Sequence, residues 1–141
     1  LRKSRTPLST LFYTISKKDE EAINEIASEV NLIKNVHTLA GQLSHGQKQW
    51  LEIGMLLAQK PNLLLIDEPA AGMTAPERQK TVSLLKNLSK NQSVIVVEHD
   101  MEFIKSLDCR VTVLHDGTVL AEGSLEHVSK NNKVIDVYLG R

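Results

Sequence analysis

Cysteine is almost absent from this sequence: Cys109 is the only one among 141 residues. An intramolecular disulfide and a multi-cysteine metal site are therefore excluded, and we expect a reducing, cytoplasmic setting. A surplus of one charge is absent too, because 17 Lys and Arg balance 17 Asp and Glu. The composition gives no sign of a nucleic-acid partner or of an anionic membrane surface.

Long hydrophobic runs are also missing, since no apolar stretch approaches the roughly 18 residues that a bilayer span needs. The first residues, Leu1–Arg5, lack the apolar stretch of a signal peptide. We expect no direct membrane insertion, so any membrane connection would go through a partner. With 41% hydrophobic and 24% charged residues, the chain is suited to a globular core. It starts with Leu rather than Met, and we expect it to lie inside a longer protein.

Residues 1–59 are predicted to form a helical subdomain. Apolar residues at helical spacing indicate three helices, at about 7–15, 18–30 and 44–59. Acidic residues at 19–21 favour the start of the second helix, and Pro61 ends the third.

Residues 60–141 are predicted to form an α/β core with a parallel sheet. Uniformly apolar runs at 63–66 and 93–97 indicate parallel strands buried on both faces. A helix at 76–88 would join them in a right-handed crossover. Asp116-Gly117 predicts a β-hairpin of strands 110–114 and 118–121, followed by one or two short helices within 125–138.

Two adjacent carboxylates, Asp67 and Glu68, follow the first predicted strand directly. Ligands bind at the carboxyl ends of strands in open α/β sheets. One carboxylate can hold Mg²⁺ through its waters, and the next can position or deprotonate a water aimed at a phosphate. The alternative is that they cap the helix that follows.

The second strand ends in Glu98-His99-Asp100. If the two strands are neighbours, His99 would lie beside Glu68 at the same sheet edge. Histidine there can donate to a terminal phosphate or orient a water. A purely structural role for His99 is the alternative.

The third motif, Leu43-Ser44-His45-Gly46-Gln47, opens the third predicted helix. Ser44 is a good N-cap, and Gly46 lets the backbone approach a ligand closely. The free N–H groups of a helix start form an anion site, for which phosphate is the obvious occupant. A capped helix that tolerates a glycine is the alternative.

In their order and spacing, these three motifs resemble the ATP-binding subunit of ABC transporters, a partial P-loop NTPase-like fold. Residues 43–47, the signature segment, match the family's signature, and the strand from Leu63 to Glu68 matches its Walker B strand. Residues 70–74, the D-loop segment with Ala71, Gly72 and Met73, match the D-loop, and His99 matches the switch histidine.

The resemblance implies roles in ATP hydrolysis. Asp67 would bind the Mg²⁺ of ATP through water, Glu68 would polarise the attacking water, and His99 would contact the γ-phosphate. A second ATPase subunit would complete each site. The residues that face the partner's ATP would be Ser44, His45, Gly46 and Gln47, with Ala71, Gly72 and Met73 of the D-loop segment nearby.

Finer details resemble the ATPases of importers for branched-chain amino acids and urea. They include Ala71-Gly72-Met73, the stretch Glu98–Met101, and the ending Tyr138–Arg141. Residues 43–57 are most similar to the urea branch, so we expect urea uptake, with branched-chain amino acids second. Membrane subunits of the transporter are the implied partners, on the inner face of the plasma membrane.

The sequence departs from the family pattern in two places. His45 stands where the signature usually has glycine, which could weaken the phosphate contact or add a donor. No Gly-x-x-x-x-Gly-Lys-Ser/Thr occurs in the 141 residues, so the backbone nest and lysine of a P-loop are missing.

We expect this chain to be a carboxyl-terminal part of a longer ATPase and to be inactive alone. The alternatives are a soluble ABC-type ATPase outside transport and a non-catalytic module with this fold.

Overall fold

The computed structural model describes residues 15–138. The chain divides into two compact units between Val97 and Glu98, and each is described by itself. The helix predicted at about 7–15 lies almost entirely outside the described residues.

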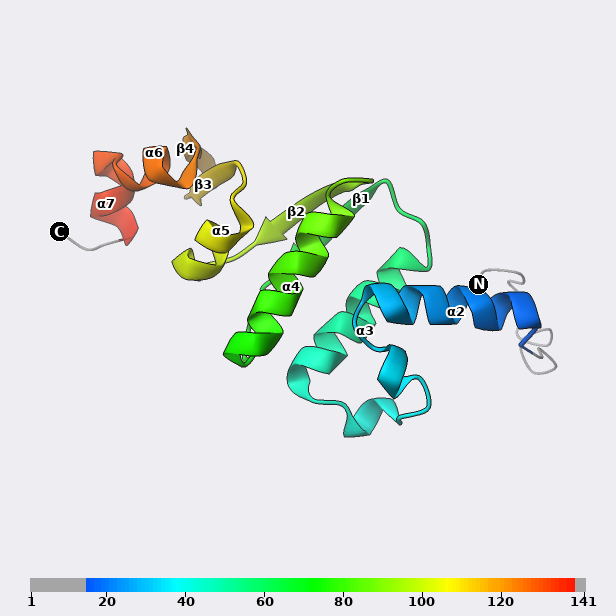
Figure 1. Cartoon of the computed structure of the whole chain (residues 1–141). Helices are drawn as coiled ribbons and strands as arrows, with labels where there is room; N and C mark the ends of the chain where they lie inside the picture. The colour runs from blue at the N-terminus through cyan, green and yellow to red at the C-terminus, as the bar shows by residue number, and fades with distance from the viewer. Residues whose placement is uncertain (1–14, 139–141) are drawn as a thin grey trace. The chain divides into compact units, whose positions relative to one another are not determined.

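The first unit begins with a helical part (Figure 1). Its elements are α2 (Lys17–Glu29), the short 3-10 turns η1 (Ile33–Asn35) and η2 (Ala40–Gln42), and α3 (His45–Leu57). Ser16 caps α2 in a reciprocal arrangement with Asp19, whose carboxylate accepts from the Ser16 hydroxyl at 2.6 Å. The helices predicted at 18–30 and 44–59 are confirmed, and each of their ends lies within two residues of its predicted position. Their shared core includes Val30, Trp50 and Ile53.

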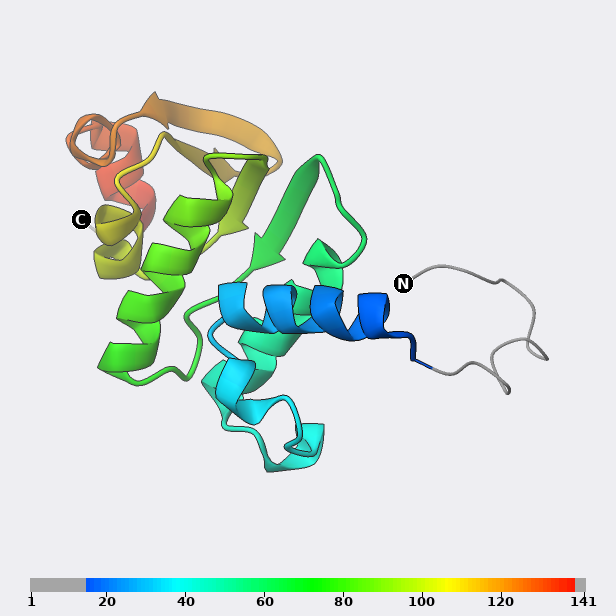
Figure 2. The same ribbon diagram turned by 45° about the vertical axis from the view of Figure 1, so that its right-hand side comes forward.

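A strand, a helix and a second strand complete this unit. They are β1 (Leu63–Asp67), α4 (Ala75–Leu88) and β2 (Ser93–Val97). The strands pair in parallel, from Leu63 opposite Ser93 to Asp67 opposite Val97. Helix α4 runs alongside the two strands in both views (Figures 1 and 2). The predicted parallel pairing and the helix between the strands are thus confirmed.

Burial of these strands on both faces is a wrong prediction. Leu64 and Ile66 point to a covered face and are 1% and 8% exposed, whereas Leu65 on the opposite face is 65% exposed. Ile95 and Val97 on β2 are 49% and 57% exposed. Successive strand residues point to opposite faces of the sheet. Among the described residues of this unit, other elements cover one face and leave the other face exposed.

The second unit contains α5 (Met101–Leu107), β3 (Val111–His115), β4 (Thr118–Gly123), α6 (Leu125–Ser129) and α7 (Asn132–Tyr138). The hairpin is confirmed: β3 and β4 are antiparallel, and Asp116 and Gly117 have φ values of 46° and 73°. Ala121, Val128 and Val134 form its core. The sequence interpretation did not include α5, which Asp100 caps by accepting from two backbone N–H groups.

Candidate functional site

The signature segment forms a capped start of α3. Ser44 is extended, with φ −61° and ψ 165°, and its hydroxyl accepts from the Gln47 backbone N–H at 3.2 Å. In return the Gln47 side-chain oxygen accepts from the Ser44 N–H at 2.9 Å. These reciprocal bonds fix the entry of the chain into the helix. The first-turn N–H groups of His45 and Gly46 then lie at the end of the helix where an anion is favoured.

The D-loop segment turns the chain between β1 and α4. Gly72 has φ 63°, a left-handed conformation that suits glycine. Ala71 donates to the Glu68 carbonyl at 3.1 Å, and Met73 donates to the Ala70 carbonyl at 3.3 Å. Ala70 and Met73 are buried. The segment is therefore a compact turn held by its own backbone.

The structure brings the signature segment and the D-loop segment together. A Cβ on Gly72 would lie 3.1 Å from Cδ2 of His45, so the imidazole lies against this glycine. Glu77, in the first turn of α4, accepts from the Ser44 hydroxyl at 2.9 Å. The same carboxylate accepts from the Thr74 hydroxyl at 2.7 Å and from its N–H at 3.0 Å.

A buried hydrogen bond holds the two helices together below this contact. The Trp50 indole N–H donates to the Thr81 hydroxyl at 2.9 Å, and Thr81 is 0% exposed. The Thr81 hydroxyl in turn lies 3.1 Å from the Met73 sulfur and 3.0 Å from the Glu77 carbonyl oxygen. Trp50 therefore packs as a core residue and also ties α3 to α4.

Sequence reasoning missed Glu77 as the partner of Ser44 and Thr81 as the partner of Trp50. Thr74 and Glu77 have the spacing of a helix capping box, which was the available signal. The Thr74 hydroxyl first, then the Thr74 N–H and the Ser44 hydroxyl, hold the pKa of the Glu77 carboxyl below its ordinary value. Glu77 is therefore ionised at neutral pH.

The carboxylate pair lies at the carboxyl end of β1. Asp67 is the last residue of the strand, and the Glu68 N–H donates to the Val97 carbonyl at 2.9 Å, which extends the parallel ladder by one residue. Glu68 has φ 44°, a left-handed conformation that is uncommon for a residue with a side chain. Such backbone strain is concentrated at functional positions.

His99 belongs to the second unit, two residues after β2 ends. The Glu98 carboxylate accepts from the backbone N–H groups of His99 and Asp100 at 3.1 and 3.3 Å. His99 itself is exposed. Its predicted place beside Glu68 stays a prediction.

The chemistry of Asp67 fits Mg²⁺ bound through water. Among residues 15–138 there is no group of three or more His, Cys, Asp and Glu that could hold a metal ion. Mg²⁺ keeps several waters and commonly uses one or two carboxylates plus substrate phosphates. An exposed carboxylate at a strand end supplies what such an ion takes from the protein.

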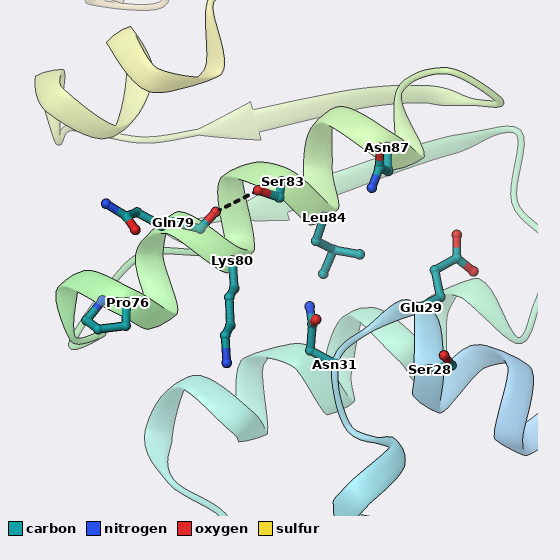
Figure 3. A pocket seen from close by; sticks show the side chains of 9 residues that line it. All are labelled: Ser28, Glu29, Asn31, Pro76, Gln79, Lys80, Ser83, Leu84 and Asn87. Carbon is teal, nitrogen blue, oxygen red and sulfur yellow. Dashed lines mark hydrogen bonds between the residues drawn. The ribbon is translucent and has the colours of Figure 1, made fainter.

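A cavity of about 670 Å³ lies elsewhere on the first unit, between the end of α2 and one side of α4 (Figure 3). Asn31, Lys80 and Ser83 are among its mostly polar lining. None of the site residues predicted from the sequence lines it. The candidate site is therefore the pair of motif segments and the strand end rather than this cavity.

Comparison with known proteins shows the family and the fold of this chain. A family model described as ABC transporter matches residues 2–71. The solved ADP conformation of MJ1267, an ATP-binding cassette of an ABC transporter, superposes with a TM-score of 0.76 at 28% identity, over 99% of this chain and 58% of that one. The chain belongs to the ABC transporter ATPase family and has its α/β fold.

Two curated relatives are named for branched-chain amino acid transport. The branched-chain amino acid transport ATP-binding protein BraF of Pseudomonas aeruginosa is 35% identical over 140 residues, which cover 94% of this chain and 55% of BraF. LivG of Escherichia coli, also named for high-affinity branched-chain amino acid transport, is 31% identical over 129 residues, covering 88% of this chain and 51% of LivG. The chain spans about half the length of these relatives.

Proposed function

We propose that this chain supplies the signature, the catalytic carboxylates and the switch histidine of an ATP-hydrolysing subunit in an ABC importer. The observation that carries the proposal is the contact between the two motif segments of the first unit, next to the carboxylate pair. The signature segment caps α3 and contacts the D-loop segment, which follows the carboxylate pair directly. Residues 1–59 would act as the helical subdomain and residues 60–141 as part of the ATPase core.

Each site residue has a role that suits its place. Bound Mg²⁺ supplies positive charge to the phosphates of ATP, and Asp67 at the strand end would hold that ion through water. Glu68 would accept a hydrogen bond from the attacking water and take up its proton, because it directly follows the strand and is exposed. His99 would donate to the terminal phosphate.

The signature segment would act on the nucleotide of a second ATPase subunit. Ser44, His45, Gly46 and Gln47 lie at a helix N-terminus, where backbone N–H groups and a hydroxyl favour an anion. His45 would add an imidazole donor beside Gly72 in place of the family's usual glycine. Ala71, Gly72 and Met73 would line the same subunit boundary. ATP thus bridges two subunits, and hydrolysis removes the bridge.

The solute taken up would be urea or a branched-chain amino acid. Residues 43–57 support the urea branch through their resemblance, while the names of BraF and LivG support the amino-acid branch. Membrane subunits of the transporter would be the partners, and the ATPase would work on the inner, cytoplasmic face of the plasma membrane. Within residues 15–138 no helix is long and apolar enough to cross a membrane.

ATP turnover by this sequence would require a P-loop supplied by other residues. The 141 residues contain no Gly-x-x-x-x-Gly-Lys-Ser/Thr, and the phosphates of ATP need that nest of N–H groups. We therefore propose that the 141-residue chain alone does not hydrolyse ATP.

Transport by reconstituted vesicles tests the proposal. The complete ATPase subunit that contains these residues would be purified with its membrane subunits and placed in liposomes with Mg-ATP. Uptake of labelled urea or labelled leucine, lost in Glu68→Gln, is the expected result. ATP turnover without a membrane partner and without uptake of either solute would favour an ATPase outside transport.

A further inference from the structure

Glu77 connects the two motif segments with different oxygens of one carboxylate. Its Oε1 accepts from the Ser44 hydroxyl at 2.9 Å. Its Oε2 accepts from the hydroxyl and the N–H of Thr74, at 2.7 and 3.0 Å. Ser44 belongs to the signature segment and Thr74 ends the D-loop segment, so this one side chain contacts both.

The carboxylate also fills the space above Gly46. A Cβ at that position would lie 2.8 Å from both Cδ and Oε1 of Glu77. This is the N-terminal end of α3, which the proposed function assigns to a phosphate. A negative group of the protein itself therefore stands where a negative ligand would approach.

The Ser44 hydroxyl has only one proton to donate. It accepts from the Gln47 N–H at 3.2 Å and donates to Glu77 at 2.9 Å. Donation to a phosphate thus requires the hydroxyl to leave Glu77. Repulsion between the carboxylate and the phosphate acts in the same direction, because both carry negative charge.

We propose that Glu77 is a positioning residue that holds the Ser44 hydroxyl until a phosphate binds, then releases it while keeping its bonds to Thr74. Phosphate binding would thereby take the Ser44 hydroxyl away from Glu77 and leave the Thr74 contact in place. The inference rests on the proposed function, because it takes the signature segment as a phosphate site. It adds the residue that competes with the phosphate for the Ser44 hydroxyl.

A phosphate titration of the 141-residue chain tests this inference at pH 7. Inorganic phosphate is the probe, and the backbone amide resonances of Ser44, Gly46 and Gln47 report its binding. Glu77→Gln removes the charge but keeps an oxygen that can accept from Thr74, and we expect phosphate to bind about five- to tenfold more tightly. The gain should shrink as NaCl is added, since salt screens the charge.

Glu52→Gln is the matched control. It makes the same chemical change on the exposed side of α3, about 12 Å along the helix from Ser44. Its phosphate affinity should equal that of the unsubstituted chain. Fluorescence of Trp50, the only tryptophan, verifies that each variant is folded.

A second measurement uses the unsubstituted chain and needs no variant to fold. The carboxyl carbon resonance of Glu77 should shift with phosphate along the same curve as the Gly46 amide. Amide shifts with an unmoved Glu77 carboxyl, or equal affinities in Glu77→Gln and the parent, would overturn the inference while leaving the signature segment as a phosphate site. Backbone amide resonances of residues 44–47 that do not shift with phosphate in any variant would overturn it as well. The transport measurement decides the proposed function separately.

Discussion

The signature segment and the carboxylate pair are positioned in different ways. Side chains from elsewhere in the chain hold the signature segment and the helix that it opens: Ser44 bonds to Glu77, 33 residues away, and Trp50 of α3 bonds to Thr81, 31 residues away. The carboxylate pair is positioned by the backbone, through the register of β1 with β2 and the left-handed φ of Glu68.

This difference suits the two proposed tasks. A surface that must fit the nucleotide of another subunit benefits from a rigid, cross-linked shape before the partner arrives. A carboxylate that takes up a proton must lie next to the attacking water, and the end of β1 places Glu68 at the strand edge where ligands bind in α/β sheets. Substitutions at the signature segment should therefore affect stability, whereas those at the carboxylate pair should affect chemistry.

Glu68→Gln should produce the largest effect. In the complete ATPase we expect turnover to fall by about 10²- to 10⁴-fold, because the amide cannot accept a proton from water. Since the backbone positions this residue, the free energy of unfolding should change by less than about 1 kcal/mol. Steady-state turnover and urea unfolding measure the two quantities. Turnover near that of the parent would remove Glu68 from the catalytic role.

Thr81→Val should destabilise the first unit by about 1–3 kcal/mol, because the buried Trp50 indole N–H loses its acceptor. Urea unfolding followed by circular dichroism, which needs no tryptophan, measures the loss. The double variant Trp50→Phe with Thr81→Val removes the donor too, so the two losses should not add. Strict additivity would show that the hydrogen bond contributes nothing to holding α3 against α4.

Gly72→Ala should cost about 1–2 kcal/mol of unfolding free energy, since alanine is strained at φ 63° and its Cβ would press on the His45 ring. Gly41→Ala is the matched control, because a Cβ there meets nothing within 4 Å. Thermal unfolding of both variants gives the comparison. Equal melting temperatures would contradict the close packing of the two motif segments.

The smallest expected effect is a pH dependence from Glu77. Its pKa in the folded chain is lowered from 4.5, chiefly by the Thr74 hydroxyl, with Ser44 and Lys80 acting in the same direction. The stabilisation is thus fully present above pH 4.5 and is lost as the pH falls through the lower folded-state pKa. The stability difference between the parent and Glu77→Gln should be constant near neutrality and shrink below pH 4.5. A stability difference that grows as the pH falls would mean that folding raises the pKa of Glu77 instead of lowering it.

Local patterns predicted much of the fold. Apolar runs gave both parallel strands, and Asp116-Gly117 gave the hairpin turn. Helix α5 was missed because its seven residues are too few for a periodic pattern, although Asp100 is a recognisable cap.

The site could be predicted only as separate motifs. Ser44 and Asp67–Glu68 were identifiable from residue type and spacing, yet the contacts of Ser44 with Glu77 and of His45 with Gly72 depend on how α3 packs against α4. Such tertiary contacts leave no trace in a local pattern. The exposed face of β1 and β2 was missed for a related reason, since an apolar run does not tell which of its faces is covered.

We propose that each ATP site uses Glu68 of one subunit and the signature segment of the other. Mixing two inactive forms of the complete ATPase tests it most directly: one carries Glu68→Gln, and the other carries Gly46→Asp, which adds a second negative charge beside the Glu77 carboxylate at the proposed phosphate site. In each parent dimer every site has one defect, whereas a mixed dimer has both defects in one site and leaves the other intact. We predict that ATP turnover reappears on mixing. Mixed dimers as inactive as their parents would contradict the shared site.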